Sequence, residues 1–403
     1  MQKKALVVAL GAALVVQGAF AQKKAESDSA VVLYGKVYPE LIWPSGSGAT
    51  PAGATTCTIC GTPEGEGSII KRTEMESSNT RFGVRGHEKL GSNLKAIFQL
   101  ETEFHVDSND SRFARRNSFV GLASKSWGTV KLGRMDTPFK DYGLDLSFLG
   151  VSSGNFVSPS DLTRKTGFGT NSASSFHLRR ENAVQYESPS FGGVEFAVQY
   201  STNEAKTATR NPEVVSMGIA YEKGPLYLAL AYEQHSDLFG GSRNVRSSQS
   251  NFSNQAVSSD DRAVQATAKV KLGKIHTIEA DYIRKEYEES GAIAAGRFQS
   301  YENNAWLVNW QAKWAPRLAT QLYYIRADKG SCSLVAAACN TDGLESSQWT
   351  AGLAYYFSRR TYLFVLASEI RNGYSARFNN SNQQEPSVGE DVRQIAVGLH
   401  TSF

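Results

Sequence analysis

The chain has 403 residues, with 43 Lys or Arg against 39 Asp or Glu, and a formal net charge of +4. This near balance, without clustered basic residues, argues against a nucleic-acid-binding surface. Length alone would allow two or three soluble domains, but no linker, composition shift or charge block divides the chain. We therefore expect a single domain after the N-terminal segment.

The first 21 residues have the pattern of an export signal. Lys3 and Lys4 form a basic start, residues 5–16 an apolar core, and Ala19-Phe20-Ala21 an A-x-A cleavage site. An apolar run of about a dozen residues is shorter than the ~20 that a helix needs to span a bilayer. Removing this segment lowers the formal charge to +2. The sequence predicts a cleaved signal peptide at 1–21, an exported mature chain at 22–403, and no transmembrane helix.

Alternation of apolar and polar residues with period two recurs along the mature chain. In residues 93–106, for example, Leu94, Ala96 and Phe98 share one face, and Lys95 and Gln99 share the other. Sixteen strands are predicted: 31–43, 68–87, 93–106, 113–124, 128–134, 179–187, 194–200, 214–222, 226–233, 262–272, 274–287, 298–314, 318–327, 348–357, 361–371 and 392–403.

Seven short turns alternate with eight longer loops between these strands. An even strand number with this alternation is typical of outer-membrane barrels. Polar residues at every second position cannot fill a dry core, because buried unpaired polar groups cost several kcal/mol. A water-filled lumen accommodates them while the apolar face meets lipid. The predicted fold is all-β: a 16-stranded antiparallel transmembrane β-barrel.

Residues 134–178 form a long connection without a helical period. Its first half carries many large apolar groups, such as Phe139, Tyr142 and Phe148, which a disordered linker would not hold. Connections of this length are usually functional or disordered. We expect this segment to be packed, inside the barrel.

The four cysteines form two close pairs in polar segments between strands, Cys57 with Cys60 and Cys332 with Cys339. In an exported protein such pairs favour two local disulfides. A redox-active C-x-x-C would need a helix N-terminus, which the flanking Thr and Pro residues do not offer. A four-cysteine zinc site is disfavoured in an oxidising compartment.

With the strands placed, the sequence resembles the trimeric general porins of proteobacterial outer membranes. The motifs that carry the resemblance are Leu33-Tyr-Gly-Lys36, Thr80-Arg-Phe-Gly-Val-Arg-Gly86, Leu94-Lys-Ala-Ile-Phe-Gln-Leu-Glu101, Phe119-Val-Gly-Leu122, Gly128-Thr-Val-Lys-Leu-Gly-Arg134, Tyr186-Glu-Ser-Pro-Ser-Phe-Gly-Gly193 and Val397-Gly-Leu-His-Thr-Ser-Phe403. The resemblance implies a homotrimer in outer-membrane lipid, with Arg134 a candidate contact to a neighbour. It also implies that the last strand, ending at Phe403, is read by the barrel assembly machinery.

The resemblance further implies that the third extracellular loop, here 134–178, folds inward and narrows the pore. In the family, acidic groups of this loop face basic residues of the wall. Carried over by motif, the wall positions are Lys36, Arg81, Arg116 and Arg179, with Arg85 as a further candidate. Strand parity independently places all of these inward except Arg116, whose parity matches that of the outward-facing Val120 and Leu122.

Asp141 and Asp145 are the candidate acidic partners in the loop. The chain lacks the Pro-Glu-Phe-Gly-Gly tip of the enteric members, so which of the two faces the lumen stays open. The wall cations outnumber these acids, which favours a modest preference for anions, although Glu101 and Glu103 also face inward.

One pattern in the sequence is shared with hydrolases. Gly150-Val-Ser-Ser-Gly154 matches G-x-S-x-G, with Asp161 and His177 nearby, but Pro159 and the Ser/Gly-rich surroundings do not favour the required strand–turn–helix context. The histidines show no metal-binding spacing. We predict no catalytic residues, no metal and no cofactor. The expected function is a passive channel for ions and small hydrophilic solutes; the alternative is a non-conducting barrel serving as an anchor, an adhesin or a barrel enzyme.

Overall fold

The computed structural model describes residues 28–77, 79–108, 111–151, 157–168, 176–202, 204–208, 210–239, 257–292, 294–379 and 385–403. The predicted signal peptide, and residues 152–154 of the G-x-S-x-G match, lie outside these ranges. Within the described part, no helix is long and apolar enough to cross a membrane.

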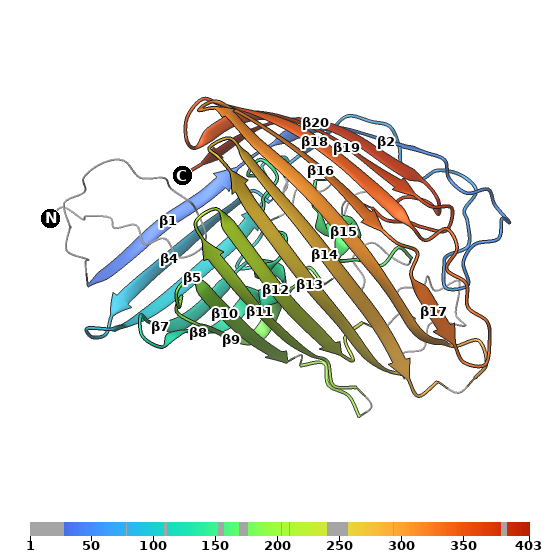
Figure 1. Cartoon of the computed structure of the whole chain (residues 1–403), viewed down its shortest axis with the longest axis horizontal. Coiled ribbons are helices and arrows are strands. Elements are labelled where there is room, and N and C mark those ends of the chain that lie inside the picture. The colour runs from blue at the N-terminus through green and yellow to red at the C-terminus, as the bar shows by residue number, and fades with distance from the viewer. Residues whose placement is uncertain are drawn as a thin grey trace.

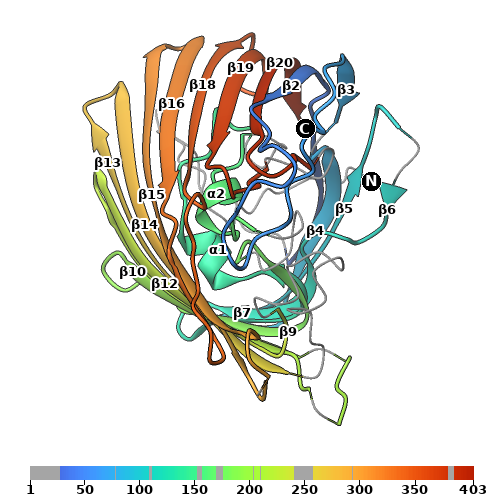
Figure 2. The ribbon, with the colours of Figure 1, turned by 90° about the vertical axis from the view of Figure 1, so that its right-hand side faces the viewer.

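The strands form one closed antiparallel barrel (Figures 1 and 2). The strand segments are β1 (Ser29–Val37), β2 (Glu40–Ser47), β3 (Glu74–Glu76), β4 (Arg81–Lys89), β5 (Leu94–Phe104), β6 (Ser111–Arg112), β7 (Ser118–Ser124), β8 (Gly128–Asp136), β9 (Arg179–Glu187), β10 (Val194–Thr202), β11 (Glu213–Lys223), β12 (Leu226–Ser236), β13 (Ser258–Leu272), β14 (His276–Ser290), β15 (Phe298–Ala315), β16 (Leu318–Ala327), β17 (Ser331–Leu334), β18 (Ser346–Tyr356), β19 (Thr361–Asn372) and β20 (Asp391–Ser402).

These segments make sixteen barrel strands, because β1/β2, β3/β4, β6/β7 and β16/β17 are each one strand in two pieces. The ring closes where β20 pairs with β1 and β2, with Lys36 opposite Ser402 and Trp43 opposite Ile395. We call this place the seam. The predicted 16-stranded antiparallel barrel is therefore confirmed.

Three predicted strands are not continuous. The strand predicted at 31–43 is interrupted between β1 and β2. The strand predicted at 68–87 holds only β3 and β4, and the one at 113–124 is broken before β7. Asn79 and Ala114 lie in the latter two breaks with φ of 59° and 54°, a left-handed conformation outside the extended β region. Apolar and polar residues do not alternate at these two breaks, which read Ser77-Ser-Asn-Thr80 and Ala114-Arg-Arg-Asn117, so the loss of alternation was the available signal.

Several strands run further than predicted. β13 begins at Ser258, four residues before the predicted start, and Ser258 lies opposite Ser290 of β14. The first four residues of β13 are all polar, so they show no alternation, and only the backbone ladder with β14 marks them as strand.

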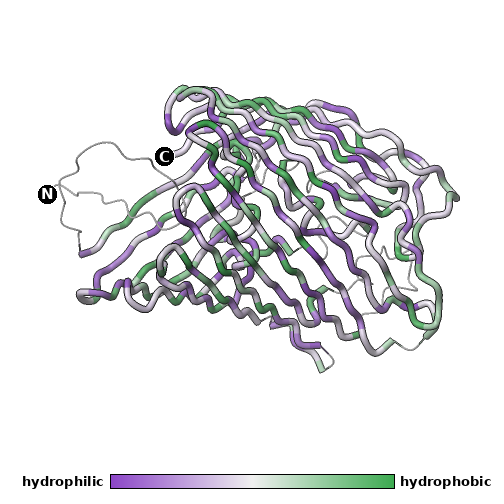
Figure 3. The backbone as a smooth tube through the Cα atoms, viewed as in Figure 1, coloured by the Kyte–Doolittle hydropathy of each residue, from purple (hydrophilic) through white to green (hydrophobic). Residues whose placement is uncertain are grey.

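Hydrophobic and hydrophilic residues alternate along the strands of the wall (Figure 3), and the exposure of their side chains shows which face each kind is on. On β15, the outward Trp306 and Val308 are 51% and 54% exposed, whereas Asn309 is fully buried. On β13, Val264 is 40% exposed and its neighbour Gln265 only 1%. The outer face is thus apolar, while the inner face presents polar groups to the lumen, the space that the strands enclose.

We call residues 137–178 the long loop. Its described residues contain two short helices that the sequence analysis did not predict. α1 (Pro138–Tyr142) contacts β10, β11 and β12, and α2 (Ser160–Thr163) contacts β15, β16 and β18 (Figure 2). Pro138 suits the first helical position, where an amide hydrogen has no partner anyway. The predicted packing of the apolar residues is confirmed, since Phe139 and Phe148 are fully buried.

Candidate functional site

Arg116 is the most enclosed of the predicted wall cations, at 7% exposure. Its Nε lies 2.7 Å from Glu101 Oε1, and its Nη1 lies 2.7 Å from Glu103 Oε2 and 2.6 Å from Asn79 Oδ1. Arg116 reaches inward because it lies in the break between β6 and β7, where strand parity no longer applies. Two carboxylates of β5 thus neutralise its charge.

Arg81 and Arg85 of β4 lie beside this ion pair. Arg81 Nη1 is 3.8 Å from Glu101 Oε1, and the Arg81 side chain is 30% exposed. The Arg85 guanidinium lies 4.8 Å from the centre of the Tyr34 ring, whose hydroxyl donates to Glu101 Oε2 at 2.9 Å. These guanidinium groups keep part of their surface accessible, so their field can act on a passing ion.

Lys36 of β1 completes this part of the wall. Its Nζ lies 4.8 Å from the centre of the buried Tyr38 ring. Among the residues that the structure describes, no carboxylate lies within ion-pair distance of Lys36. A cation held by an aromatic face without a carboxylate leaves its charge uncompensated.

Arg179 of β9 belongs to a second ion-pair group. Arg179 Nη2 lies 3.0 Å from Asp136 Oδ1, which also lies 2.7 Å from Lys140 Nζ of α1. Asn117, the residue after Arg116, accepts a hydrogen bond from Arg179 Nε at 2.7 Å and donates to Asp136 Oδ2 at 2.9 Å. The chain neighbours Arg116 and Asn117 therefore join the two groups.

We call Lys36, Arg81, Arg85, Arg116 and Arg179 the basic wall group. With Lys140 of α1 there are six cations, and the carboxylates that they contact are Glu101, Glu103 and Asp136. Three positive charges are in excess. These three acids belong to wall strands, β5 and β8, and not to the long loop.

The two acids predicted in the loop, Asp141 and Asp145, have different surroundings. Asp141 in α1 is exposed. Asp145 forms an ion pair with Lys269 of β13, which lies on another part of the wall from the basic wall group. The structure therefore does not bring Asp145 together with that group. Lys269 could be identified from sequence only as an inward-facing residue.

Sequence reasoning also missed Asp136, Lys140 and Arg180. Arg180 Nε donates to Ser201 Oγ of β10 at 3.4 Å, so it reaches the same face as Arg179 beside it. Asn182 has φ of 52° and the β8–β9 register shifts nearby, so strict alternation is lost there. Asp136 and Lys140, four residues apart with Pro138 at the helix start between them, could have been recognised as an i,i+4 pair.

Arg164 of the long loop is fully buried. It joins the loop to the wall, and it also joins separate parts of the loop to each other. Its Nη2 donates to Gln265 Oε1 of β13 at 2.8 Å and to the Phe139 carbonyl at 3.2 Å. Its Nη1 donates to His177 Nδ1 at 2.9 Å, because a guanidinium can only donate. Burial lowers the pKa of Arg164 to about 10, so it remains charged at neutral pH.

Further contacts fasten the loop along the wall. The amides of Phe139, Leu146 and Leu149 donate to inward side chains at 2.9, 2.6 and 2.6 Å, the acceptors being Ser216 Oγ, Glu279 Oε2 and Gln321 Oε1. These acceptors lie on β11, β14 and β16. With the contacts of α1 and α2, the loop thus follows the wall from β10 to β18.

We expect the packing of the long loop to weaken in acid. Burial and the positive charges of Lys140, Arg164 and Arg179 hold the pKa of His177 well below 6.5. The negative charge of Asp136 acts in the opposite direction and is outweighed. When the loop is loosened, His177 binds a proton with its ordinary pKa of 6.5. The free energy that favours the packed loop should therefore fall as pH drops below 6.5, by up to ~1.4 kcal/mol per pH unit. Hydrogen exchange of residues 157–168, corrected for intrinsic rates, should accelerate at pH 5.

The His177→Gln variant is the control for this effect. Its amide oxygen can still accept from Arg164, and it does not titrate in this range. The acceleration should therefore be smaller in the variant; an equal acceleration in both proteins would remove His177 from this role.

The possible catalytic partners are engaged in other contacts. Asp161 Oδ1 lies 3.2 Å from Lys165 Nζ, and His177 faces Arg164, so these two residues do not form a Ser-His-Asp relay with one another. Within the described residues, no three His, Cys, Asp or Glu side chains are placed to hold a metal ion.

Both predicted disulfides are confirmed, Cys57–Cys60 and Cys332–Cys339. The two loops that contain these disulfides also contact each other. The Thr58 amide donates to the Asn340 carbonyl at 2.8 Å, and the Asn340 amide donates to Thr58 Oγ1 at 2.9 Å. The loop after β2 therefore docks against the loop before β18.

Glu390, just before β20, fixes the same loop to the seam. Its carboxylate accepts from the amides of Ser68, Ile69 and Ser387 at 2.8, 3.1 and 2.9 Å, and it is 1% exposed. Segments from both ends of the chain are thus hydrogen-bonded to each other beside the seam.

Comparison with known proteins settles the family. A family profile described as "Gram-negative porin" matches residues 6–375. The chain belongs to this family. Major outer membrane protein P.IB of Neisseria meningitidis serogroup B is 26% identical over 308 residues, which cover 76% of this chain and 81% of that protein. An outer membrane porin protein of Bordetella pertussis is 31% identical over 172 residues, which cover 39% of this chain and 42% of that protein.

Solved structures of porins share the fold. An anion-selective porin from Comamonas acidovorans aligns with TM-score 0.68 and 21% identity, over 93% of this chain and 100% of that one. The trimer form of in-vitro folded OmpT, an outer membrane protein of Vibrio cholerae, aligns with TM-score 0.63 and 15% identity, over 94% and 100%. Together with the family match, this makes the protein a porin of the outer membrane of a Gram-negative bacterium.

Proposed function

We propose that this porin conducts small hydrophilic solutes passively with a modest preference for anions, and that it is not an enzyme. The basic wall group carries this proposal, because its five cations and Lys140 contact three carboxylates among the described residues, Glu101, Glu103 and Asp136. Charge excess at a narrow point of a pore sets its selectivity. The Comamonas acidovorans porin, described as anion-selective, supports the same direction.

The long loop would narrow the channel as the predicted constriction loop, 134–178. Its amides bind inward side chains of β11, β14 and β16, and its helix α1 brings Lys140 to Asp136 beside the basic wall group. The remaining passage would then run between the loop and the wall of β1, β4 and β5. Solutes in it would pass Lys36, Arg81 and Arg85 on the wall and Asp141 on the loop.

A homotrimer is the proposed assembly, supported by the family and by the trimeric OmpT neighbour. The outer face of β1 offers apolar contact surface, since Val31 and Leu33 are 63% and 61% exposed. Arg134, the contact suggested by the sequence, is already bound within its own chain to Glu181 at 3.0 Å and to the Arg115 carbonyl at 2.8 Å. Apolar surface is therefore the better candidate for the contact.

Two further proposals concern biogenesis. Residues 1–21 would be removed on export, leaving the barrel domain 22–403, which the intact mass of the purified protein checks. The end of β20 would be recognised by the barrel assembly machinery, so that deletion of Phe403 should lower the folded yield. In the structure, Phe403 lies over Gly35, where any side chain would meet the ring at 2.5 Å.

Single-channel recordings in a planar bilayer test the function and the assembly together. We expect stepwise conductance in groups of three equal steps, and a reversal potential in a KCl gradient that indicates chloride preference. Absence of conductance would favour the alternative of a non-conducting barrel, an anchor or adhesin. If conductance rose only in isolated single steps, the trimer would be contradicted. A reversal potential that indicates potassium preference would contradict the assigned selectivity.

A further inference from the structure

Three arginines lie on the outward face of the barrel, near the ends of their strands that lead into longer connections. They are Arg326 of β16, Arg371 of β19 and Arg393 of β20. All three are exposed, whereas Ile325 and Ile370, the residues just before the first two, are buried. Because side chains of a strand alternate between its two faces, the arginines point away from the lumen. We call them the arginine cluster.

Two members of the cluster lie on either side of a serine. Arg371 is directly opposite Ser347 of β18, and Ser347 is directly opposite Arg326. Neighbouring strands are about 4.8 Å apart, so the backbones of the two arginines are separated by roughly 10 Å. The side chain of Ser347 between them is short, so both guanidinium groups can reach one ligand that lies over it.

The cluster has an excess of positive charge. Glu369 is shared by two of its members, with Arg371 Nη2 at 3.0 Å and Arg393 Nε at 2.6 Å from its carboxylate oxygens. Within the described part of the chain, no carboxylate lies within ion-pair distance of Arg326. If Asp391, on the same face of β20, is counted as a second acid, one positive charge still remains in excess.

Two outward arginines on neighbouring strands are matched by acids instead. Arg262 Nε of β13 lies 3.1 Å from Asp260 Oδ1. Arg284 of β14 lies 2.7 Å from Glu286 and 2.6 Å from Glu302. The excess of positive charge therefore distinguishes the arginine cluster from these neighbours.

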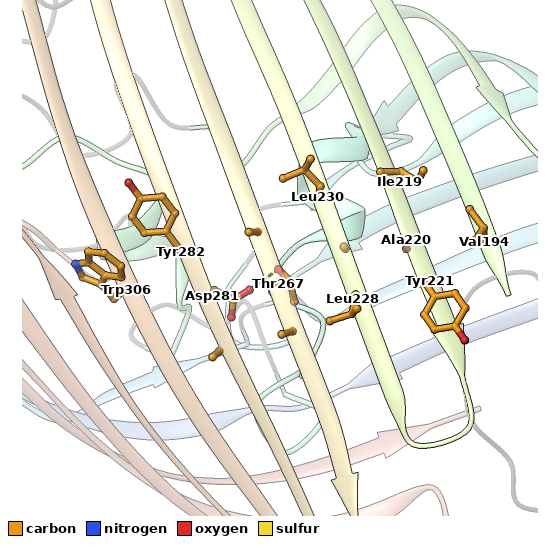
Figure 4. Close-up of a pocket in the computed structure, with 14 residues that line it drawn as sticks. Val194, Ile219, Ala220, Tyr221, Leu228, Leu230, Thr267, Asp281, Tyr282 and Trp306 are labelled. Atoms are coloured by element: carbon orange, nitrogen blue, oxygen red, sulfur yellow. Dashed lines mark hydrogen bonds between the residues drawn. The ribbon is translucent and has the colours of Figure 1, made fainter.

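The cluster lies at the level of an aromatic belt. Trp306 of β15 is directly opposite Arg326, and its ring centre is 4.5 Å from that of Tyr282 on β14 (Figure 4). Tyr324 and Trp349 are opposite each other on β16 and β18, with ring centres 4.4 Å apart. Outward Trp and Tyr gather where the hydrocarbon core of a bilayer meets its headgroups. The guanidinium groups are therefore at the level of lipid phosphates.

We propose that the arginine cluster binds an anionic lipid whose headgroup carries phosphate groups, in the leaflet on the side of the longer connections. A guanidinium binds phosphate through paired hydrogen bonds, and a net negative headgroup matches the excess positive charge. The acyl chains lie against the outward Leu322 and Leu353, which are 39% and 42% exposed. The proposal rests on the outer-membrane position of the barrel and does not depend on whether the channel conducts.

Native mass spectrometry of the delipidated porin in non-ionic detergent tests this. The protein is titrated with lipid A that carries both phosphates, with the same lipid A after removal of both phosphates, and with phosphatidylethanolamine. We expect one phosphorylated lipid A bound per chain, with at least five-fold preference over each of the other two lipids. Equal binding of the phosphorylated and dephosphorylated forms, or equal binding of phosphatidylethanolamine, would overturn the proposal.

Variants then place the site. Arg326→Gln with Arg371→Gln should lower the binding of phosphorylated lipid A at least five-fold, to the level of the dephosphorylated form. Arg393 remains in this variant and keeps the nearby carboxylate paired. Arg262→Gln with Arg284→Gln is the matched control, because it removes the same formal charge from the outward face, and it should bind as the unaltered protein does. Unchanged binding in the cluster variant, or an equal loss in the control, would refute the site.

Discussion

Neutralising Lys36, Arg81 and Arg85 together should abolish the anion preference. Three positive charges are in excess around the basic wall group, so the triple substitution to Gln leaves the remaining cations and carboxylates in balance. These three were chosen because Arg116 and Arg179 hold carboxylates at 2.7 and 3.0 Å. Removing either of those would take the guanidinium partner from a buried carboxylate, which is destabilising.

The size of the effect follows from Coulomb's law. At about 6 Å in a water-like dielectric, one charge changes the energy of a passing ion by about 0.7 kcal/mol. Screening at 0.1 M salt reduces this to about 0.4 kcal/mol. Three charges then give about 1.2 kcal/mol, roughly a seven-fold change in anion occupancy. The reversal potential in a KCl gradient should move close to the value of an unselective pore, and the difference should shrink as salt rises.

The matched control neutralises three exposed lysines of the short connections, Lys125, Lys223 and Lys274. It removes the same formal charge far from the wall group, so selectivity should stay as in the unaltered protein. An unchanged reversal potential in the wall variant, or an equal shift in the control, would show that these residues do not set selectivity.

Replacing Arg164 with Ala should release the long loop while the barrel stays folded. The substitution removes the hydrogen bonds to Gln265, to the Phe139 carbonyl and to His177 together. Each hydrogen bond to a charged group is worth about 1.5–3 kcal/mol, so a total loss of about 3–5 kcal/mol is expected after relaxation. Arg164 takes no part in the strand ladder, so the strand hydrogen bonds remain.

Two measurements separate the loop from the barrel. Hydrogen exchange of residues 137–151 and 157–168 should accelerate by at least 100-fold, whereas β13 and β14 keep their protection. Single-channel current should become noisier and larger, because the loop no longer holds its place against the wall. Arg359→Ala, at an exposed arginine between β18 and β19, should change neither. Unaltered loop protection in Arg164→Ala would show that the apolar contacts of Phe139 and Phe148 suffice.

Alternation of side chains was enough to predict the barrel and the shared face of Lys36 and Arg81, which lie opposite each other on β1 and β4. For Arg179 the alternation is interrupted at Asn182 (φ 52°). It was not enough for Arg116, because Arg116 lies in the break around Ala114 (φ 54°), where parity counted from Val120 and Leu122 no longer applies. The local disulfides followed from spacing and compartment, since Cys57 and Cys60 are three residues apart.

Long-range partners could not be predicted. Asp145 meets Lys269 more than 120 residues away, and nothing in either neighbourhood specifies that pairing. The path of the long loop depends on which inward side chains accept its amides, among them Glu279 and Gln321. These are two of many polar residues on the inner face, so the sequence offers no reason to select them.

The seam has a consequence for the kinetics of folding. The contacts that close it join residues separated by hundreds of positions, such as Ser68 with Glu390 and Cys57 with Ser375. No such contact can form before the C-terminal strands exist, so neighbouring hairpins can pair first and the ring must close last. The entropy of closing a loop rises only with the logarithm of its length, so the penalty is kinetic rather than thermodynamic. Before the seam closes, β1 and β20 each have one edge whose backbone hydrogen-bonding groups are unpaired. During that interval the chain is most exposed to pairing with another copy.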